Sequence, residues 1–137
     1  MAAGCRSVGG PASRPVAIDS LLIYNVSMSK RIMQEATFLI LTALADGSQH
    51  GYGIIGDVAA ISEGRVTLRA GTLYTALDRL RADDLISLDR EEIVDGRLRR
   101  YYRLTPDGAR RLAVEAARLR SNATAALSRL SQAEVTT

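Results

Sequence analysis

The sequence predicts a mainly α-helical fold with a small β-hairpin, and three observations support that prediction. Apolar residues recur at helical spacing in three segments between residues 29 and 86. A stretch of period two flanks Asp95-Gly96, the strongest short hairpin signal in the chain. From Thr105 onward the apolar spacing returns to that of one long helix. This order predicts a helix-turn-helix followed by a β-hairpin and by a long C-terminal helix, which we assign to dimerisation.

Composition limits the classes of protein that the chain can belong to. A length of 137 residues fits one domain with a modest core. The net charge is +3, and Lys30 is the only lysine among 18 basic residues. The planar guanidinium of arginine can donate paired hydrogen bonds to phosphates and to guanine edges. Because the chain has one cysteine, Cys5, and one histidine, His50, it offers no disulfide framework and no zinc cluster.

Two further classes of protein, membrane-spanning proteins and enzymes, have no signal in the sequence. No apolar run approaches the ~18 residues that a membrane span needs, so we expect a cytoplasmic protein. No nucleophile-base pair, P-loop or dinucleotide fingerprint is present, so we expect no enzyme, no catalytic residues and no cofactor.

Residues 1–28 differ in composition from the rest of the chain. The first part is rich in Gly, Ala, Ser, Arg and Pro, which is typical of disorder. Met28 and Met33 lie just before the first strongly patterned helix. We therefore expect a disordered extension, or a mis-annotated one with translation starting at one of these methionines.

The first helix is expected over Ser29–Asp46. Residues 38–45 are apolar nearly all round, so this helix must be covered on more than one side. We infer that another subunit covers part of it, with Phe38 and Leu41 at the dimer interface. Gly47 suits the αL position that follows a helix.

The second helix is expected from His50 to about Ser62, with an apolar stripe at Ile54, Ile55, Val58 and Ile61. We interpret His50, at the helix start, as a cap or packing residue rather than a functional one. A turn at residues 63–65 then leads into Val66–Leu68, which we expect to be a short strand.

The third helix, within Leu68–Ile86, has two different faces. Leu73, Leu77 and Leu80 form an apolar stripe, whereas Thr72, Thr75 and Arg79 lie opposite. Its first turn, Ala70-Gly71-Thr72, is small enough to bring the backbone close to a phosphate, which the helix dipole favours. We interpret it as a recognition helix for a DNA major groove, although an ordinary amphipathic surface helix has the same pattern.

A hairpin follows that helix directly. Leu85–Leu88 is a short β-type run, and alternation over 98–104 indicates the return strand. Four arginines crowd the tip and the return strand and suit phosphates or a narrow minor groove, namely Arg97, Arg99, Arg100 and Arg103. The alternative is a solvated hairpin whose arginines pair with the acids of the opposing strand, Asp89, Glu91 and Glu92. We expect Arg97 and Arg99 to be the freer pair.

The last helix begins at Thr105-Pro106, with Thr as cap and Pro at the first position. Its apolar residues follow heptad spacing, which indicates a dimerisation seam formed by Leu112, Ala116, Leu119, Ala123, Ala126 and Leu130. The alternative is that this helix folds back on the first helix of its own subunit.

Three blocks of the sequence resemble the PadR family of bacterial transcriptional regulators. They are His50–Ile54, Ala70–Leu80 with Leu85-Ile86, and Arg100–Gly108, and they cover most of residues 30–110. The brevity of the chain resembles the group with a single C-terminal helix. Asp84 departs from the pattern because the family usually has Gly there, but Asp tolerates αL better than most residues.

The resemblance implies a winged helix-turn-helix homodimer that represses transcription from an inverted-repeat operator in double-stranded DNA. It implies that the Asp95-Gly96 hairpin is the wing and that the third helix faces DNA through Gly71, Thr72, Tyr74 and Thr75. It also implies release of DNA by a small aromatic or drug-like effector near the dimer interface. The chain has no Trp to stack on such a ligand.

These readings combine into one set of expectations. The domains are residues 1–28 as an extension, 29–104 as a DNA-binding domain and 105–137 as a dimerisation helix. Candidate DNA-binding residues are Arg69, Gly71, Thr72, Tyr74, Thr75, Arg97 and Arg99, and no metal site is expected. Two alternatives stay open: a metal-sensing winged-helix repressor, and a winged-helix protein-interaction module. A basic recognition face with Arg69 and Arg79 argues against the second.

Overall fold

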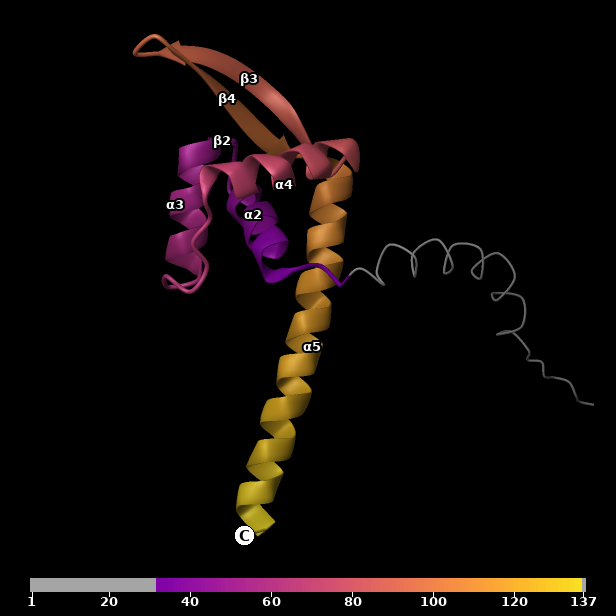
Figure 1. Ribbon diagram of the computed structural model, residues 1–137. Coiled ribbons are helices and arrows are strands. Elements are labelled where there is room, and N and C mark those ends of the chain that lie inside the picture. The colour runs from indigo at the N-terminus through magenta and orange to yellow at the C-terminus, as the bar shows by residue number, and fades with distance from the viewer. Residues whose placement is uncertain (1–31, 137) are drawn as a thin grey trace, which may run out of the picture. The chain divides into compact units, whose positions relative to one another are not determined.

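The computed structural model describes residues 32–136. Residues 34–137 form one compact unit, and the fold described below is that of this unit. The expectations for residues 1–28 lie outside the described residues. The elements, labelled as in Figure 1, are α2 (Glu35–Ala45), β2 (Gln49–His50), α3 (Gly51–Ile61), α4 (Ala70–Ala82), β3 (Ile86–Val94), β4 (Arg97–Leu104) and α5 (Pro106–Thr136). This order confirms the predicted winged helix-turn-helix.

Helix α2 is the centre of the core. Its buried residues are Leu39, Ile40, Leu41, Ala43 and Leu44. Helices α3 and α5 and strand β4 all contact α2, so this chain covers it without a second subunit. The expectation that Leu41 lies at an interface with a second subunit is therefore wrong, whereas Phe38 is only partly buried. The helix also begins later than expected, at Glu35, and Gly47 after it has a φ of 141°, which lies outside the αL region.

Helices α3 and α4 form the helix-turn-helix. His50 caps α3 as expected, because its Nδ1 accepts a hydrogen bond of 2.9 Å from the N–H of Gly53. The expected strand at Val66–Leu68 is wrong, since these residues are an irregular connection. The buried hydroxyl oxygen of Ser62 accepts the N–H of Val66 at 3.0 Å and so fixes this connection.

Helix α4 is held by the apolar stripe that the sequence predicts. Leu73 and Leu77 are completely buried and Leu80 nearly so. The helix ends in a Schellman motif, in which the N–H of Leu85 donates to the carbonyl of Leu80 and that of Asp84 to Arg81. Asp84 has a φ of 63°, so it adopts the αL conformation in place of a glycine.

The sheet is antiparallel with strand order β2-β4-β3. We call the β3–β4 hairpin the wing; a register shift between Leu88 and Arg90 marks a bulge in it. Strand β2 pairs Gln49 with Tyr102 and His50 with Tyr101 and is the third strand of the sheet. In Figure 1 the wing arches beyond the helices at its tip.

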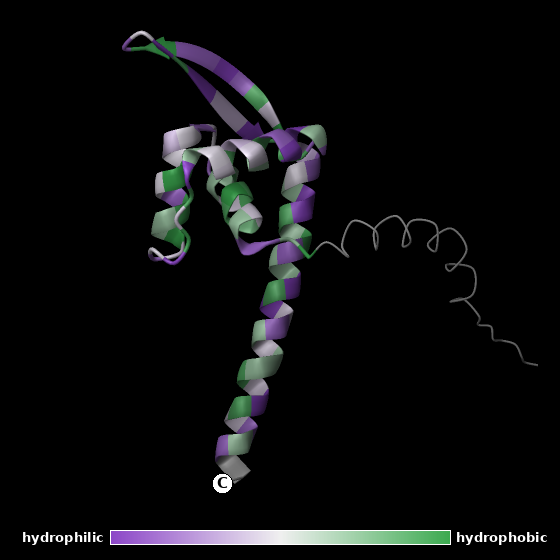
Figure 2. Ribbon diagram, viewed as in Figure 1, coloured by the Kyte–Doolittle hydropathy of each residue, from purple (hydrophilic) through white to green (hydrophobic). Residues whose placement is uncertain are grey.

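Helix α5 begins as predicted, because the Thr105 hydroxyl oxygen accepts the N–H of Gly108 at 3.0 Å. Its first turns contact α2 and β4, and the rest extends away from the helix-turn-helix (Figure 1). Apolar residues recur along this exposed part, as the green bands of Figure 2 show. None of the helices in residues 32–136 has the length and apolar character to cross a membrane.

Candidate nucleic-acid interface

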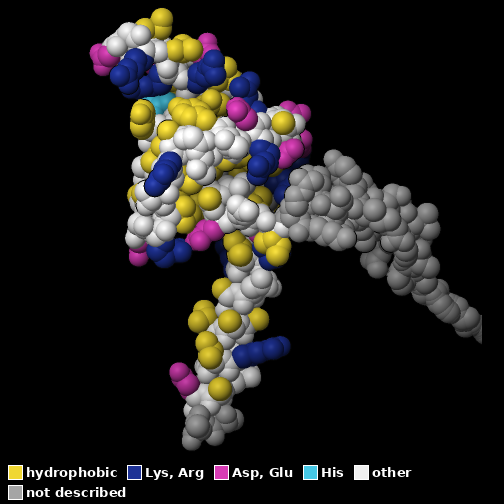
Figure 3. Space-filling model, viewed as in Figure 1, with side chains coloured by type: hydrophobic (Ala, Val, Ile, Leu, Met, Phe, Trp, Pro, Cys, Tyr) yellow, Lys and Arg dark blue, Asp and Glu magenta, His cyan; other side chains and the backbone are white. Residues whose placement is uncertain are grey.

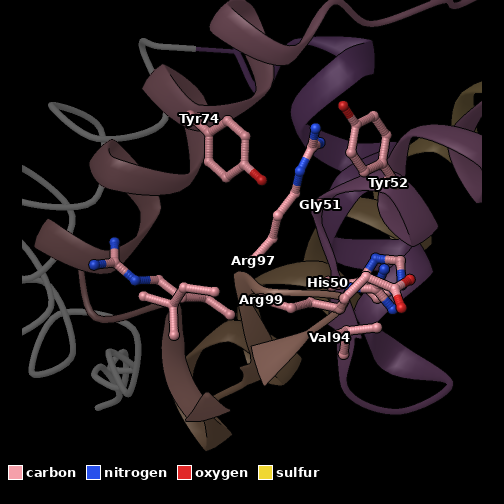
Figure 4. Close-up of a pocket in the computed structure, with 10 residues that line it drawn as sticks. His50, Gly51, Tyr52, Tyr74, Val94, Arg97 and Arg99 are labelled. Carbon is pink, nitrogen blue, oxygen red and sulfur yellow. The ribbon is translucent and has the colours of Figure 1, made fainter. Parts of the chain in front are cut away.

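An open cleft of about 600 Å³ separates the wing from the starts of α3 and α4. Its lining comes from three places in the sequence: His50, Gly51 and Tyr52 at the start of α3, Tyr74 on α4, and Val94, Asp95 and Arg97–Arg100 on the wing. Figure 4 shows Arg97 extending into this cleft from the wing side. The fold thus brings together Tyr74, Arg97 and Arg99 from the predicted site residues.

A stack of three side chains fixes the wing relative to α3. The rings of His50 and Tyr101 meet edge to face, with centroids 5.4 Å apart. The guanidinium of Arg90 lies 3.9 Å from the centroid of the Tyr101 ring, within cation–π range. Because His50 both caps α3 and pairs with Tyr101 in the sheet, the base of the wing and the start of α3 are held together.

The charges of the wing divide into paired and unpaired sets. Arg100 pairs with Glu91 at 3.0 Å, and Arg90 pairs with both Asp89 and Glu92. The hydrogen bond from Arg90 lowers the pKa of the Glu92 carboxyl below its usual value. Within residues 32–136 the ion pairs do not include Arg97 or Arg99, which agrees with their expected freedom. Arg90 and Arg100 therefore neutralise Asp89, Glu91 and Glu92, whereas Asp95 at the turn takes part in none of the ion pairs of residues 32–136.

Tyr74 packs closely on α3. A Cβ at Gly51 would lie 2.4 Å from the Tyr74 hydroxyl, so a side chain there would displace this ring. Tyr74 remains 44% exposed, and its hydroxyl points into the cleft (Figure 4). It can therefore donate a hydrogen bond to an anion that enters between the wing and α4.

The other candidates on α4 lie on its outer, solvent-exposed face, outside the lining of the cleft. They are Arg69, Gly71, Thr72 and Thr75. Arg69 is the N-cap residue, and no side chain caps the N-terminal N–H groups of α4. The Thr75 hydroxyl donates to the carbonyl of Gly71 at 3.0 Å, which leaves its oxygen free to accept and its methyl free for apolar contact.

Gly71 is not required by the fold. A Cβ there would meet nothing within 4 Å, and its backbone is helical without a positive φ. Alanine would favour the helix over glycine at such a position. The bare backbone at the start of α4 would therefore allow a ligand to approach it closely.

Sequence reasoning missed several residues of the cleft. Gly51 and Tyr52 belong to it, although they were recognised only as part of a motif, and Leu98 was assigned only to a strand. The hairpin alternation could not place Leu98 in this cleft, because that position depends on the curvature of the wing. Among residues 32–136, no three His, Cys, Asp or Glu side chains gather into a metal-binding group.

The candidate dimer residues fall into three groups. Leu41 is 0% exposed inside this chain, so it cannot reach a partner and is removed from the candidate surface. Phe38 and Leu112 are partly buried where α5 and α2 lie close together. The remaining residues of the seam are exposed: Ala116, Leu119, Ala123 and Leu130.

Comparison with known proteins agrees with this architecture. The model of the Transcriptional regulator PadR-like family matches residues 40–114, which is more than half of the chain. The chain is similar to Transcriptional regulator Rv3488 of Mycobacterium tuberculosis, with 41% identity over 69 residues. That match covers 50% of this chain and 61% of the length of the relative.

Two solved structures share the fold. A PadR family transcription regulator from Clostridium difficile has a TM-score of 0.60 at 25% identity, and the match covers 71% of this chain and 99% of that one. Bacillus subtilis PadR, solved in complex with operator DNA, has a TM-score of 0.53 at 22% identity. Here the match covers 58% of this chain and 45% of that one.

Proposed function

Because the chain belongs to the PadR-like family of transcriptional regulators, we propose that it binds duplex DNA as a homodimer and represses transcription from an inverted repeat. The observation that carries this proposal is the position of α4, whose start is exposed and has no side-chain cap. Through Tyr74 this helix lines the same cleft as Arg97 and Arg99 of the wing. One element offers backbone donors and hydroxyls, and the other offers positive charge. These are the groups that contact phosphates and base edges in DNA complexes.

The proposed contacts divide into two kinds. Thr72 and Thr75, on the outer face of α4, read bases in the major groove through hydroxyl oxygens and methyl groups. Arg97, Arg99 and the Tyr74 hydroxyl contact the sugar-phosphate backbone that passes along the cleft. The sequence suggested base reading by Tyr74, but its position against Gly51 favours the backbone. Figure 3 shows arginines distributed over the wing beside the helices.

Footprinting and a salt titration test the DNA-binding proposal. We expect protection of an inverted repeat upstream of the protein's own gene. Arg97→Ala should weaken binding to all duplexes and flatten the plot of log affinity against log salt by about 1 unit, because one fewer phosphate is neutralised. Arg129→Ala, which removes a charge near the far end of α5, is the matched control and should leave the slope unchanged. An unaltered slope for Arg97→Ala would remove the wing from the interface.

Base reading is tested by comparing operator with random DNA. Thr75→Val keeps the shape and one methyl but removes the acceptor oxygen, so we expect a loss on the operator only. Tyr74→Phe should cost similar amounts on both duplexes, because phosphates carry no sequence information. A Tyr74→Phe loss confined to the operator would restore Tyr74 to base reading.

We propose that α5 forms the dimer through its exposed seam. The helix has 31 residues and is therefore about 46 Å long. Leu119 is 41% exposed and Leu130 62% exposed along it. A protruding helix of this kind gains stability when a second copy buries its apolar stripe. The twofold axis would then set two α4 helices about 34–36 Å apart for successive major grooves.

Sedimentation tests this assignment with two matched pairs of substitutions. Leu119→Asp with Leu130→Asp places charges on the seam and should shift the protein to monomer at micromolar concentration. Ser121→Asp with Ser128→Asp, on the opposite side of the heptad, should leave the dimer intact. A dimer that survives the first pair would place the interface elsewhere.

We also propose that a small aromatic or drug-like effector releases DNA by changing the dimer geometry. The start of α5 is fixed to the end of α4 by two hydrogen bonds from Thr105. The Thr105 hydroxyl donates to the carbonyl of Asp84 at 2.6 Å, and the Thr105 N–H donates to the carbonyl of Leu85 at 3.1 Å. A ligand between the two α5 helices would therefore move both α4 helices. Linkage requires that such a ligand bind more weakly to the DNA complex, and calorimetry with and without operator measures that difference.

A further inference from the structure

Three aspartates of this chain are followed directly by glycine, and the structure places the three pairs in different surroundings. They are Asp46-Gly47, Asp95-Gly96 and Asp107-Gly108. An aspartate before glycine can cyclise, because glycine has no side chain that hinders attack of its amide nitrogen on the aspartate carboxyl. The reaction requires a free amide N–H, an accessible carboxyl and a backbone that can rotate. These requirements rank the three pairs.

Two of the pairs are held by hydrogen bonds. The N–H of Gly108 donates to the Thr105 hydroxyl oxygen at 3.0 Å, and Gly108 is buried in the first turn of α5. The N–H of Gly47 donates to the carbonyl of Leu44 at 3.2 Å, just after the end of α2. In both places the attacking nitrogen is engaged, so a hydrogen bond must open before the ring can close.

Asp95-Gly96 meets all three requirements. Both residues are exposed and form the turn of the wing, whose tip lies beyond the helices (Figure 1). Within residues 32–136 the Gly96 N–H donates no hydrogen bond, and the Asp95 carboxyl takes part in no hydrogen bond or ion pair. The other acid near the tip, Glu92, is engaged by Arg90.

The backbone of this turn is also only weakly held. Asp95 has a φ of 53° and Gly96 a φ of 76°. Such positive values belong to a tight two-residue turn, and a residue with a Cβ pays a steric cost to adopt them. Because neither residue is fixed by a side chain or by a hydrogen bond of its own, the turn can leave this conformation without breaking contacts elsewhere.

We propose that Asp95 is a site of spontaneous isomerisation to isoaspartate. The Gly96 amide nitrogen attacks the carboxyl carbon of Asp95 in its acid form, and the amide proton leaves with the carboxyl hydroxyl as one water, which closes a succinimide ring. Water then adds to one ring carbonyl and reopens the ring. Where water adds to the former backbone carbonyl, the chain continues through the side-chain carbonyl, so the turn gains one backbone methylene and a free α-carboxylate.

The product alters the surface proposed to bind DNA, and this consequence rests on that proposal. Arg97 directly follows Gly96 and lines the cleft together with Asp95. A longer turn moves Arg97 relative to its cross-strand partner Val94, whereas the negative charge stays at the tip. The isoaspartate form should therefore bind the operator more weakly than the native form, with a loss no larger than that caused by Arg97→Ala.

Peptide mapping of the folded protein, incubated at physiological temperature and pH, tests the chemical step. Isoaspartate at residue 95 should accumulate about fivefold faster than at residue 46, because a typical hydrogen bond must first open at Gly47. Residue 107 should react most slowly. Asp95→Glu keeps the charge but would need a larger ring, so it should abolish the product, whereas the matched control Asp46→Glu should leave the rate at Asp95 unchanged. Equal accumulation at the three sites, or faster reaction at Asp46, would overturn the proposal.

Operator binding separates the isomerisation from its consequence. Incubated wild-type protein should lose affinity, incubated Asp95→Glu should not, and a carboxyl methyltransferase specific for isoaspartate should restore the wild-type protein. An equal loss in Asp95→Glu would assign the decline to damage elsewhere in the chain. Isoaspartate at residue 95 with unchanged operator affinity would overturn the effect on the wing and leave the isomerisation standing. Absence of duplex binding by fresh wild-type protein would instead overturn the proposed function, while the peptide map still decides the isomerisation.

Discussion

Replacing Gly71 by alanine should make the protein more stable and a poorer DNA binder at the same time. Gly71 is exposed, lies in the first turn of α4 and would accommodate a Cβ without any contact within 4 Å. Nothing in the free protein therefore requires a glycine. If DNA approaches the start of α4 closely, the added methyl group occupies space that the phosphate or sugar needs.

The size of each effect follows from the position of the residue. Alanine is favoured over glycine by about 0.8–1.0 kcal/mol inside a helix, and we expect about half of that at the second residue of α4. This corresponds to a rise in Tm of roughly 2–4 °C for a domain of this size. A misplaced methyl group in a close-packed contact costs roughly 1–3 kcal/mol, so operator affinity should fall about tenfold.

Gly56 supplies the matched control. It is exposed on α3, its added Cβ would also contact nothing within 4 Å, and it lies outside the cleft. Gly56→Ala should raise Tm by roughly 4–8 °C, because it lies inside the helix, and should leave operator affinity unchanged. Thermal melts and equilibrium binding at one fixed salt concentration measure both properties for each variant.

The reasoning fails in either of two ways. If Gly71→Ala binds the operator as tightly as the wild-type protein, the start of α4 does not approach DNA closely. If Gly71→Ala lowers Tm while Gly56→Ala raises it, the fold does need glycine at residue 71. A parallel loss of affinity in both variants would indicate an effect on flexibility rather than on the contact.

Three further predictions concern the scaffold. Asp84→Gly should raise the free energy of unfolding by about 0.5 kcal/mol and Glu63→Gly by about 1 kcal/mol. Both residues have positive φ, and Asp tolerates the αL conformation better than Glu does. Urea denaturation measures both changes, and a lower free energy of unfolding in either variant would argue against backbone strain. Gly108→Ala should destabilise the fold by roughly 3 kcal/mol, since its Cβ would lie 1.9 Å from the carbonyl oxygen of Leu85; a wild-type Tm would show that α5 is held differently. Burial raises the pKa of the Tyr102 phenol above its usual 10.0, so this phenol ionises first in the unfolded state. The free energy of unfolding therefore falls as the pH rises above about 10. Tyr102→Phe should remove part of that decline in thermal melts across pH 9–11, and an identical decline in the variant would assign it to other groups.

The sequence was sufficient for features that depend on local spacing. The stripe at Leu73, Leu77 and Leu80 identified the buried face of α4, and Asp95-Gly96 placed the turn of the wing. Thr105-Pro106 marked the start of α5 through its cap. The opposing acids on β3 indicated that some arginines of the wing would be paired. Arg100 does pair with its cross-strand neighbour Glu91, whereas Glu92 pairs with Arg90 on its own strand and not with Arg99 opposite.

Features that depend on long-range packing were beyond the sequence. The apolar surface of α2 was assigned to another subunit, yet α3, α5 and β4 cover it, and Leu41 is buried as a result. The third strand, Gln49–His50, could not be predicted from the sequence, because two residues are too few to show a periodicity. Only their pairing with β4 defines them as a strand. Tertiary structure likewise decided that Tyr74 rests on Gly51 and that Leu98 reaches the cleft. Spacing along the chain determines the faces of each element, whereas the approach of two faces depends on the volumes of all the side chains between them.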